Sequence, residues 1–467
     1  MTQKNWTRRE LFQAGGAALA VPYLIPSQVF GSQGAPGANE RVNVAIIGLG
    51  GRAHDIANTC LGVPSLRIAA ICDCFAPRCD DFLKWRDAKT TGKGQHWTTY
   101  TDFRSMLDKE KLDAVMVETT THARAWIVVQ AMQAGKDTYI EKPMCLTIAE
   151  GRQMVRAARK YQRVTQVGTQ QRSMPINNWA SDLVKKGALG KVLTVLAPNF
   201  VGPERWTGQP AQPLPKGGTE KFWDVWTNQA ELRPYHNSLH HGWAKWWDYD
   251  GGGLCFGVTG WGTHSYDQIQ RALGTDETGP VEVWLEEPVQ VMGTGKYIKG
   301  TVGGEDTGVA YQGLARHVVG PRAKVSMKFA TGTEVQYHLD GDRGPGLGAI
   351  FIGEKGKLEI NRNKLAANPK DLLLSPDNPG PNKKPETQYH IENWIECIKS
   401  RGRANADIEY GQRASTLCYL VNIVRAVGRV GERLKWDPVA ERFTNCDEAN
   451  QMLSRPRRKA YELADLA

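Results

Sequence analysis

The sequence has no long apolar run beyond its first residues. The one early stretch, 14–25, has 12 residues, whereas a membrane-spanning helix needs about 20. This length excludes a membrane span there, and no later stretch is long and apolar enough to form one. We therefore expect a folded protein without a membrane anchor.

The cysteines form no pattern typical of disulfides. There are nine, an odd number, and five of them lie in segments that we expect to be strands, helices or their ends: Cys60, Cys72, Cys145, Cys397 and Cys418. Such cysteines are typical of small core residues. Cys72, Cys74 and Cys79 bring three thiols together, but no second ligand pair follows at zinc spacing. We expect reduced core cysteines and no metal.

Clustered positive charge is also scarce. The formal net charge is +10, but the basic residues are scattered among 49 acidic ones. The one tight basic run is 455–459, near the C-terminus. This distribution favours a solvated basic surface over a nucleic-acid interface.

The N-terminal residues are typical of an export signal. Arg8 and Arg9 precede the apolar stretch 14–25, a pattern that predicts a twin-arginine signal over 1–31. The following residues, 32–40, are rich in Gly, Ala and Pro and predict a flexible leader. No cysteine lies at the expected cleavage point. The sequence thus predicts export to the periplasm without a lipid anchor.

Strand and helix patterns alternate from residue 41 onward. Apolar runs occur at 42–47, 66–72, 114–117, 138–140 and 164–167. Helical patterns separate them, at 52–61, 77–88, 122–134 and 148–161. This alternation predicts βαβ units and a parallel sheet, an α/β Rossmann domain over 41–168.

The first of these strands runs into a glycine-rich turn with the sequence Gly48-Leu49-Gly50-Gly51-Arg52-Ala53. In such a fingerprint the first glycine permits a tight turn, the second lets the backbone approach a pyrophosphate, and the small final residue allows close helix packing. Asp73 follows 25 residues after Gly48, where a carboxylate accepts hydrogen bonds from ribose hydroxyls and repels a 2′-phosphate. The pattern favours NAD over NADP, although Arg78 lies close by in the sequence.

Several motifs together resemble one known family. They are Tyr139-Ile140-Glu141-Lys142-Pro143, Thr119-Thr120-Thr121-His122, the segment 167–172, the glycines 251–253 and the segment 262–267. The Glu-Lys-Pro motif and its companions resemble the glucose–fructose oxidoreductase, inositol dehydrogenase and rhizopine-catabolism (Gfo/Idh/MocA) family. The segment 447–456 resembles exported members of that family.

The resemblance implies a second, α+β domain with a large, open, mostly antiparallel sheet. It would span 169–445, followed by a C-terminal tail over 446–467, and it often supports homo-oligomers. The sequence agrees independently, because strand-like runs gather at 281–285, 323–329, 334–339 and 349–352, with helical patterns near 390–399 and 410–427. Strands grouped apart from helices are typical of an α+β domain.

The resemblance also implies roles for individual residues. Lys142 matches the lysine that hydrogen-bonds the reacting oxygen, and His264 matches the general base, a role that suits imidazole. The expected cofactor-binding residues are Gly48, Gly50, Gly51, Arg52, Ala53, Asp73, Thr120, His122, Glu141 and Lys142. The expected substrate residues are Arg172, Tyr235, His236, Trp247 and Asp267, three of them from an aromatic stretch suited to stacking on sugar rings.

One position departs from the family pattern. Four residues before His264 the family has an acid or amide, and this chain has Gly260. Either Asp248 or Asp250 substitutes for it, or the proton relay is altered, or ordinary dehydrogenase activity is lost. The leading interpretation is an NAD-dependent oxidoreductase acting on a hydroxyl of a sugar, polyol or glycoside. A glycoside hydrolase, lyase or epimerase that uses NAD transiently, and a non-catalytic sugar-binding protein, remain alternatives.

Overall fold

The computed structural model describes residues 37, 40–90, 96–253, 257–292, 320–339, 346–362 and 364–463. The expected export signal, 1–31, lies outside the described residues, as does the expected leader 32–40 except for Gly37 and Glu40. All elements named below belong to one compact unit, Val42–Ala467. Within the described ranges, no helix combines the length and the apolarity that crossing a bilayer requires.

The N-terminal half of this unit is built on a parallel sheet of six strands, in the order β3-β2-β1-β4-β5-β6. The strands are β1 (Val42–Ile47), β2 (Leu66–Cys72), β3 (Thr98–Tyr100), β4 (Ala114–Val117), β5 (Asp137–Ile140) and β6 (Thr165–Val167). Every neighbouring pair runs parallel. The predicted Rossmann architecture is confirmed. The sequence missed β3, which is only three residues long and largely polar.

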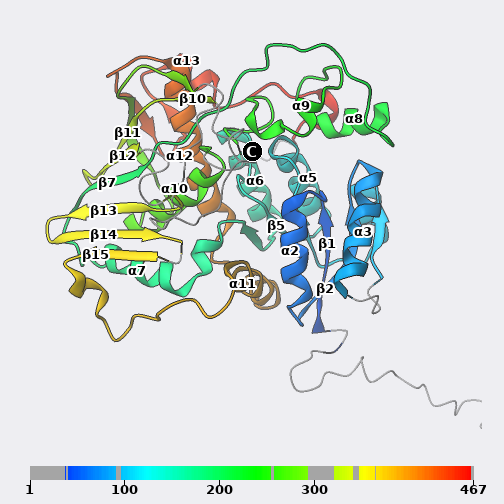
Figure 1. Cartoon of the computed structure of the whole chain (residues 1–467), viewed down its shortest axis with the longest axis horizontal. Coiled ribbons are helices and arrows are strands. Elements are labelled where there is room, and N and C mark those ends of the chain that lie inside the picture. The colour runs from blue at the N-terminus through cyan, green and yellow to red at the C-terminus, as the bar shows by residue number, and fades with distance from the viewer. Residues whose placement is uncertain are drawn as a thin grey trace, which may run out of the picture. The chain divides into compact units, whose positions relative to one another are not determined.

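Helices cross over between these strands and cover both faces of the sheet (Figure 1). They are α2 (Gly51–Leu61), α3 (Ala76–Thr90), α4 (Phe103–Lys109), α5 (Thr121–Gln133) and α6 (Ile148–Lys160). A further helix, α11 (Glu386–Ser400), comes from much later in the chain. Its Ile391 and Trp394 share one apolar core with Val44 and Ile56 of β1 and α2. The Rossmann sheet is therefore completed by a helix from the C-terminal half.

The second sheet has nine strands, in the order β15-β14-β13-β7-β12-β11-β8-β16-β17. The strands are β7 (Val192–Pro198), β8 (Pro280–Leu285), β11 (Val325–Phe329), β12 (Glu334–Leu339), β13 (Ala349–Gly353), β14 (Gly356–Asn361), β15 (Lys364–Asn368), β16 (Leu434–Asp437) and β17 (Arg442–Phe443). Only β7 and β12 pair in parallel, so the expected mostly antiparallel sheet is confirmed. The short strands β9 (Gln290–Met292) and β10 (Gly320–Arg322) form a separate pair.

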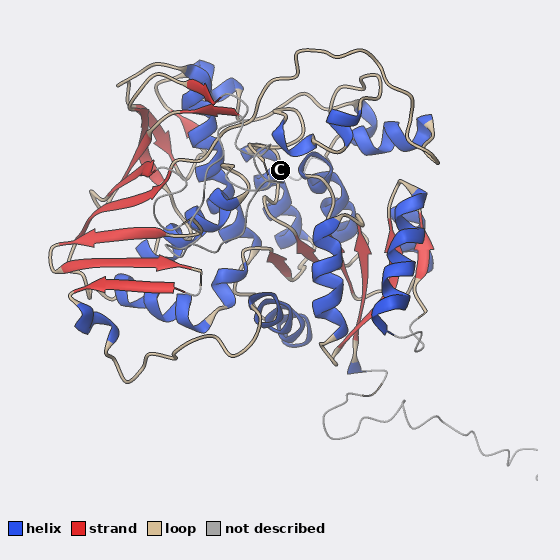
Figure 2. Ribbon diagram, viewed as in Figure 1, coloured by secondary structure: helices blue, strands red, loops and turns tan. Residues whose placement is uncertain are grey.

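One face of the large sheet is apolar because its strands alternate. In β12, Val335 and Tyr337 are buried, whereas Glu334, Gln336 and His338 are half-buried on the other face. Three helices pack on the apolar face, and Figure 2 shows helices gathered on that side. They are α7 (Pro175–Lys185), α10 (Trp261–Leu273) and α12 (Ile408–Val427). Helix α7 was not expected from the sequence.

The C-terminal segment, expected as a tail over 446–467, packs onto the fold. It contains α13 (Asp447–Gln451) and then returns toward the N-terminal half. Arg457 pairs with Glu150 of α6 at 2.6 Å, and Arg458 pairs at 2.6 Å with Asp224 of helix α8 (Glu220–Thr227). The buried Tyr461 follows. These contacts hold the segment against two distant parts of the chain.

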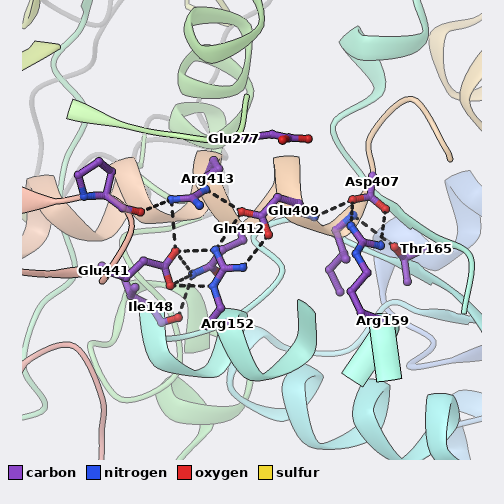
Figure 3. A network of polar contacts seen from close by, with 12 residues as sticks. Ile148, Arg152, Arg159, Thr165, Glu277, Asp407, Glu409, Gln412, Arg413 and Glu441 are labelled. Atoms are coloured by element: carbon purple, nitrogen blue, oxygen red, sulfur yellow. Dashed lines mark hydrogen bonds and ion pairs between the residues drawn. The ribbon is translucent and has the colours of Figure 1, made fainter. Parts of the chain in front are cut away.

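Ion pairs join α6 of the Rossmann half to α12 of the C-terminal half (Figure 3). Arg152 of α6 donates to Glu409 of α12 at 2.6 and 2.9 Å, and to Glu441 at 2.9 and 2.8 Å. Arg413 approaches the same two carboxylates. The side chains of this group are largely shielded from water, so removing one partner would leave a buried charge without compensation.

Candidate functional site

A cavity of about 850 Å³ opens at the carboxyl ends of the parallel strands. Residues directly after β1, β2, β4 and β5 line it, namely Gly48 and Leu49, Asp73, Glu118 and Thr119, and Glu141 and Lys142. Residues of the C-terminal half close the other side, among them Gly260, Trp261 and His264. This is the place where open α/β sheets bind their ligands.

The glycine-rich turn after β1 forms a cradle in this cavity. Gly48 has a φ of +89°, and a Cβ there would lie 2.8 Å from the Thr119 Cα, so only glycine fits. Gly50 begins α2 without a side-chain cap, and a Cβ at Gly51 would meet nothing within 4 Å. Gly50, Gly51 and Arg52, at this end of α2, all line the cavity. A helix N-terminus of this kind suits a pyrophosphate.

Asp73 holds the cradle in position. Its carboxylate accepts hydrogen bonds at 2.9 Å from the amides of Leu49 and Phe75. Burial raises the pKa of Asp73, while the nearby charge of Arg78 and these two amides act against that rise. Each carboxylate oxygen has two acceptor sites, so capacity remains for ribose hydroxyls. The chain's own residues thus fit a dinucleotide at the cradle and at Asp73.

Lys142 and His264 line the same cavity from opposite halves of the fold. The Lys142 ammonium donates to the Gly260 carbonyl at 3.2 Å. Burial holds the pKa of His264 well below its usual range, and the charges of Arg362 and Lys142 lower it further. The imidazole is therefore neutral near pH 7, and its buried Nδ1 has no hydrogen-bond partner. An ammonium and a neutral imidazole on one cavity are suited to moving a hydroxyl proton.

Two glutamates, Glu118 and Glu141, also line the cavity. Glu141 approaches Arg52 of α2, with Oε2 and Nε 3.5 Å apart. Glu118 has no hydrogen-bond partner on either carboxyl oxygen. Burial and the neighbouring Glu141 raise the pKa of Glu118 to about 8. The site therefore contains a buried carboxyl group that is largely neutral at pH 7.

Asp248 and Asp250, the two acids that could replace the carboxylate missing at position 260, differ in where their side chains lie. Asp248 pairs with Arg233 at 2.6 Å and does not line the cavity. Asp250 lines the cavity and is buried. Its Oδ2 accepts from the Gly253 amide at 3.1 Å and from the Thr259 hydroxyl at 3.0 Å, while Oδ1 is without a partner. Asp250 is thus the acid that this arrangement places at the site.

Comparison with known proteins agrees with this geometry. Residues 42–169 match a family model described as oxidoreductase family, NAD-binding Rossmann fold. Residues 175–306 and 308–463 match a second model, described as oxidoreductase family, C-terminal alpha/beta domain. The chain belongs to the Gfo/Idh/MocA oxidoreductase family. The expectation that its N-terminal half is an NAD-binding domain is confirmed.

Individual relatives of this Gfo/Idh/MocA protein are distant. It is 26% identical over 182 residues to levoglucosan dehydrogenase of Pseudarthrobacter phenanthrenivorans, a match covering 38% of this chain and 44% of the relative. It is 25% identical over 213 residues to a glycosyl hydrolase family 109 protein of Shewanella baltica, covering 40% and 45%. The matches thus span less than half of each relative. The aldose-aldose oxidoreductase of Caulobacter crescentus, at 20% identity, has the same fold with a TM-score of 0.55, over 85% of this chain and 99% of that one.

Arg172 and Asp267, expected to contact substrate, do not line the cavity. They form a buried ion pair at 2.7 Å, which Asp276 extends with a second contact to Arg172 at 2.7 Å. Two opposite charges buried side by side neutralise each other. In this Gfo/Idh/MocA protein the pair joins the short helix after β6 to α10.

Contrary to the expectation from the sequence, Tyr235, His236 and Trp247 do not line the cavity either. Tyr235 is buried in an aromatic cluster, His236 caps helix α9 (Asn237–His240), and Trp247 lies under the charges of Arg205 and Arg455. Other members of the same stretch face the cavity instead: Phe222, Trp226, His240, His241 and Trp243. A stretch rich in aromatics has to build its own core, and the sequence does not show which rings do so.

The expected cofactor-binding residues fall into two groups. Gly48, Gly50, Gly51, Arg52, Asp73, Thr120, Glu141 and Lys142 all line the cavity. Ala53 is buried in α2 behind the cradle, as close helix packing requires. His122 is buried, with its Nε2 2.8 Å from the Trp226 carbonyl, and burial lowers its pKa to about 4. His122 therefore anchors α8, which contains Trp226, rather than facing the cavity.

Sequence reasoning missed several residues of the site. Glu118 directly follows β4, just as Glu141 directly follows β5. This equivalent position after a strand could have identified Glu118 as a site residue from the sequence. Arg124 of α5 bonds the backbone carbonyls of Pro143 and Thr119, a role that no motif signals. Arg362, paired with Glu386 at 2.7 Å, directly follows the distant strand β14. No local pattern links it to the cradle.

Proposed function

We propose that this protein is an NAD-dependent oxidoreductase that acts on a hydroxyl group of a sugar, polyol or glycoside. The observation that carries the proposal is that the glycine cradle opens into the same cavity as Lys142 and His264. NAD, when bound, supplies a hydride acceptor. The likeness to levoglucosan dehydrogenase supports a carbohydrate substrate.

The chain's own residues supply the proton chemistry. Lys142 hydrogen-bonds the reacting oxygen and stabilises negative charge that develops on it. His264, neutral because of burial and neighbouring cations, accepts the hydroxyl proton. Trp243, a half-buried aromatic residue at the cavity wall, offers an apolar face to a sugar ring.

In this proposal Asp250 performs the role of the acid that the family pattern has at the position of Gly260. We expect Asp250→Asn to lower kcat/KM about thirtyfold, because a hydrogen bond to a charged group is worth ~2 kcal/mol. Asp248→Asn is the matched control, since Asp248 pairs with Arg233 away from the cavity. Steady-state kinetics of both variants measure the difference. Equal losses in the two variants would contradict the assignment.

We further propose that NAD stays bound between turnovers. Residues of the aromatic segment and of the C-terminus, among them Phe222, Trp226 and Tyr461, form part of the cavity wall. In Figure 1 the segment with α8 and α9 arches above α3 and α5. Retention agrees with the export signal proposed for residues 1–31, because an exported protein would bind NAD while it folds in the cytoplasm. The bound cofactor is then recycled by a second substrate.

Two measurements test the proposed function. Mass spectrometry of the purified, denatured protein is expected to find NAD in a near-stoichiometric amount. Incubation with a panel of sugars and polyols is expected to raise the absorbance of reduced nicotinamide with at least one of them. A protein that neither carries nor binds NAD would exclude the proposal.

The second candidate is a glycoside hydrolase, lyase or epimerase that uses NAD transiently. The likeness to a glycosyl hydrolase family 109 protein favours it. The same panel distinguishes the two, because this second activity releases product without net reduction of the bound cofactor. Lys142 in its Glu-Lys-Pro motif supports the first candidate.

A further inference from the structure

Glu118 is an unusual group for the floor of a binding cavity. It follows β4, lines the cavity and is only 7% exposed, yet neither carboxyl oxygen has a hydrogen-bond partner. Buried polar groups in folded proteins nearly always have one, so each exception calls for an explanation. No role assigned above uses this carboxyl group.

Charged and titratable groups face Glu118 from three elements. They are Arg52, Asp55 and Cys60 of α2, Tyr139 of β5 with Glu141 directly after it, and Arg124 of α5. Burial and Glu141 raise the pKa of Glu118 to about 8, against the opposing effect of the two arginines. The Glu118 carboxyl group therefore acquires its charge at a higher pH than an ordinary glutamate does.

The sheet order shows which half of a dinucleotide lies nearest. Asp73 follows β2 on one side of β1, and Glu118 follows β4 on the other side. With a pyrophosphate at the start of α2 and an adenosine ribose at Asp73, the nicotinamide half would extend toward β4 and β5. This is also the side of Lys142.

We propose that Glu118 sets the preference of the site for NAD⁺ over NADH and makes that preference depend on pH. The inference rests on the proposed function, because it requires NAD in the cavity. The oxidised ring carries one more positive charge than the reduced ring. A Glu118 carboxylate attracts that charge through the low-dielectric interior, whereas a neutral carboxyl does not. Bound NAD⁺ consequently favours loss of the Glu118 proton, and raising the pH favours NAD⁺.

The test measures which form of the cofactor the protein selects. Wild-type protein is equilibrated with mixtures of NAD⁺ and NADH between about pH 6.5 and about pH 9.5, separated from free nucleotide and denatured. Mass spectrometry then gives the bound ratio. We expect the ratio of bound NAD⁺ to NADH to rise about tenfold across this range, equivalent to about one unit of pKa coupling.

Glu118→Gln removes the titrating group and is expected to keep the low-pH ratio throughout. Glu396→Gln, on the exposed face of α11, is the matched control and should follow the wild type. A wild-type ratio that does not change with pH, or an unchanged rise in Glu118→Gln, would overturn the inference. If the glutamine variant fails to fold, the wild-type profile decides alone. If neither nucleotide binds at any pH, the proposed function itself fails.

Discussion

Replacing Lys142 with methionine is expected to lower kcat about 10³-fold while leaving the amount of bound NAD close to that of the wild type. The ammonium is placed in the cavity by its bond to the Gly260 carbonyl. Methionine keeps most of the side-chain volume but provides neither the positive charge nor the hydrogen bond. Loss of one such preorganised group costs up to ~4 kcal/mol of transition-state stabilisation. Single-turnover reduction of the bound cofactor measures the effect directly.

The control for this variant is Lys160→Met, at the exposed end of α6. It removes the same charge from the protein without touching the cavity, and we expect wild-type rates. If Lys142→Met also retained wild-type rates with every substrate, the assignment of Lys142 to the reacting oxygen would be wrong. A variant that lost NAD as well would show that the lysine serves mainly in cofactor binding.

Replacing Gly50 with valine is expected to weaken NAD binding by more than about 100-fold, a loss of ~3 kcal/mol. The backbone at Gly50, with φ −77° and ψ −175°, is one that valine adopts easily. A Cβ there would meet only the end of Arg78, at 3.5 Å. The fold should therefore tolerate valine. The added methyl groups would occupy the space through which a pyrophosphate approaches the start of α2.

Gly62→Ala, at the opposite end of the same helix, is the control. Gly62 is exposed and has an ordinary φ of −90°. Thermal unfolding followed by circular dichroism, with both proteins free of NAD, should give similar midpoints, since bound ligand would itself stabilise the fold. Equilibrium dialysis with NAD then isolates the binding defect. Full NAD binding by Gly50→Val would show that the cradle is not the pyrophosphate site.

Local patterns were sufficient to predict most of the Rossmann half, although not β3 or the covering helix α11. The strands expected at 42–47, 66–72 and 114–117 coincide with β1, β2 and β4, because buried parallel strands are continuous apolar runs. The large sheet was harder. Strands such as β14 and β15 mix charged with apolar residues, and pairing with neighbours, rather than their own composition, makes them strands.

The residues of the site also fall into those that local patterns predict and those that only tertiary contacts determine. The cradle, Asp73 and Lys142 each belong to a short motif, so spacing along the chain was enough to predict their place at the cavity. Asp248 and Asp250 are two residues apart, and only the folded loop shows that the second faces inward. Arg172 and Asp267 matched the expected residue types for substrate binding, but the structure pairs them with each other. Whether a charged side chain meets a ligand or a partner depends on tertiary contacts.

The helix α11 has a consequence for how this protein is made and divided. Ile391 and Trp394 belong to the same buried apolar core as residues of β1 and α2, and so cover that part of the Rossmann sheet. During synthesis, apolar surface of that sheet would stay exposed until residues 386–400 had left the ribosome, when most of the chain is already made. A fragment ending at residue 168 would lack this cover and should aggregate. Any attempt to graft the nucleotide-binding half onto another protein must therefore carry residues 386–400 along with it.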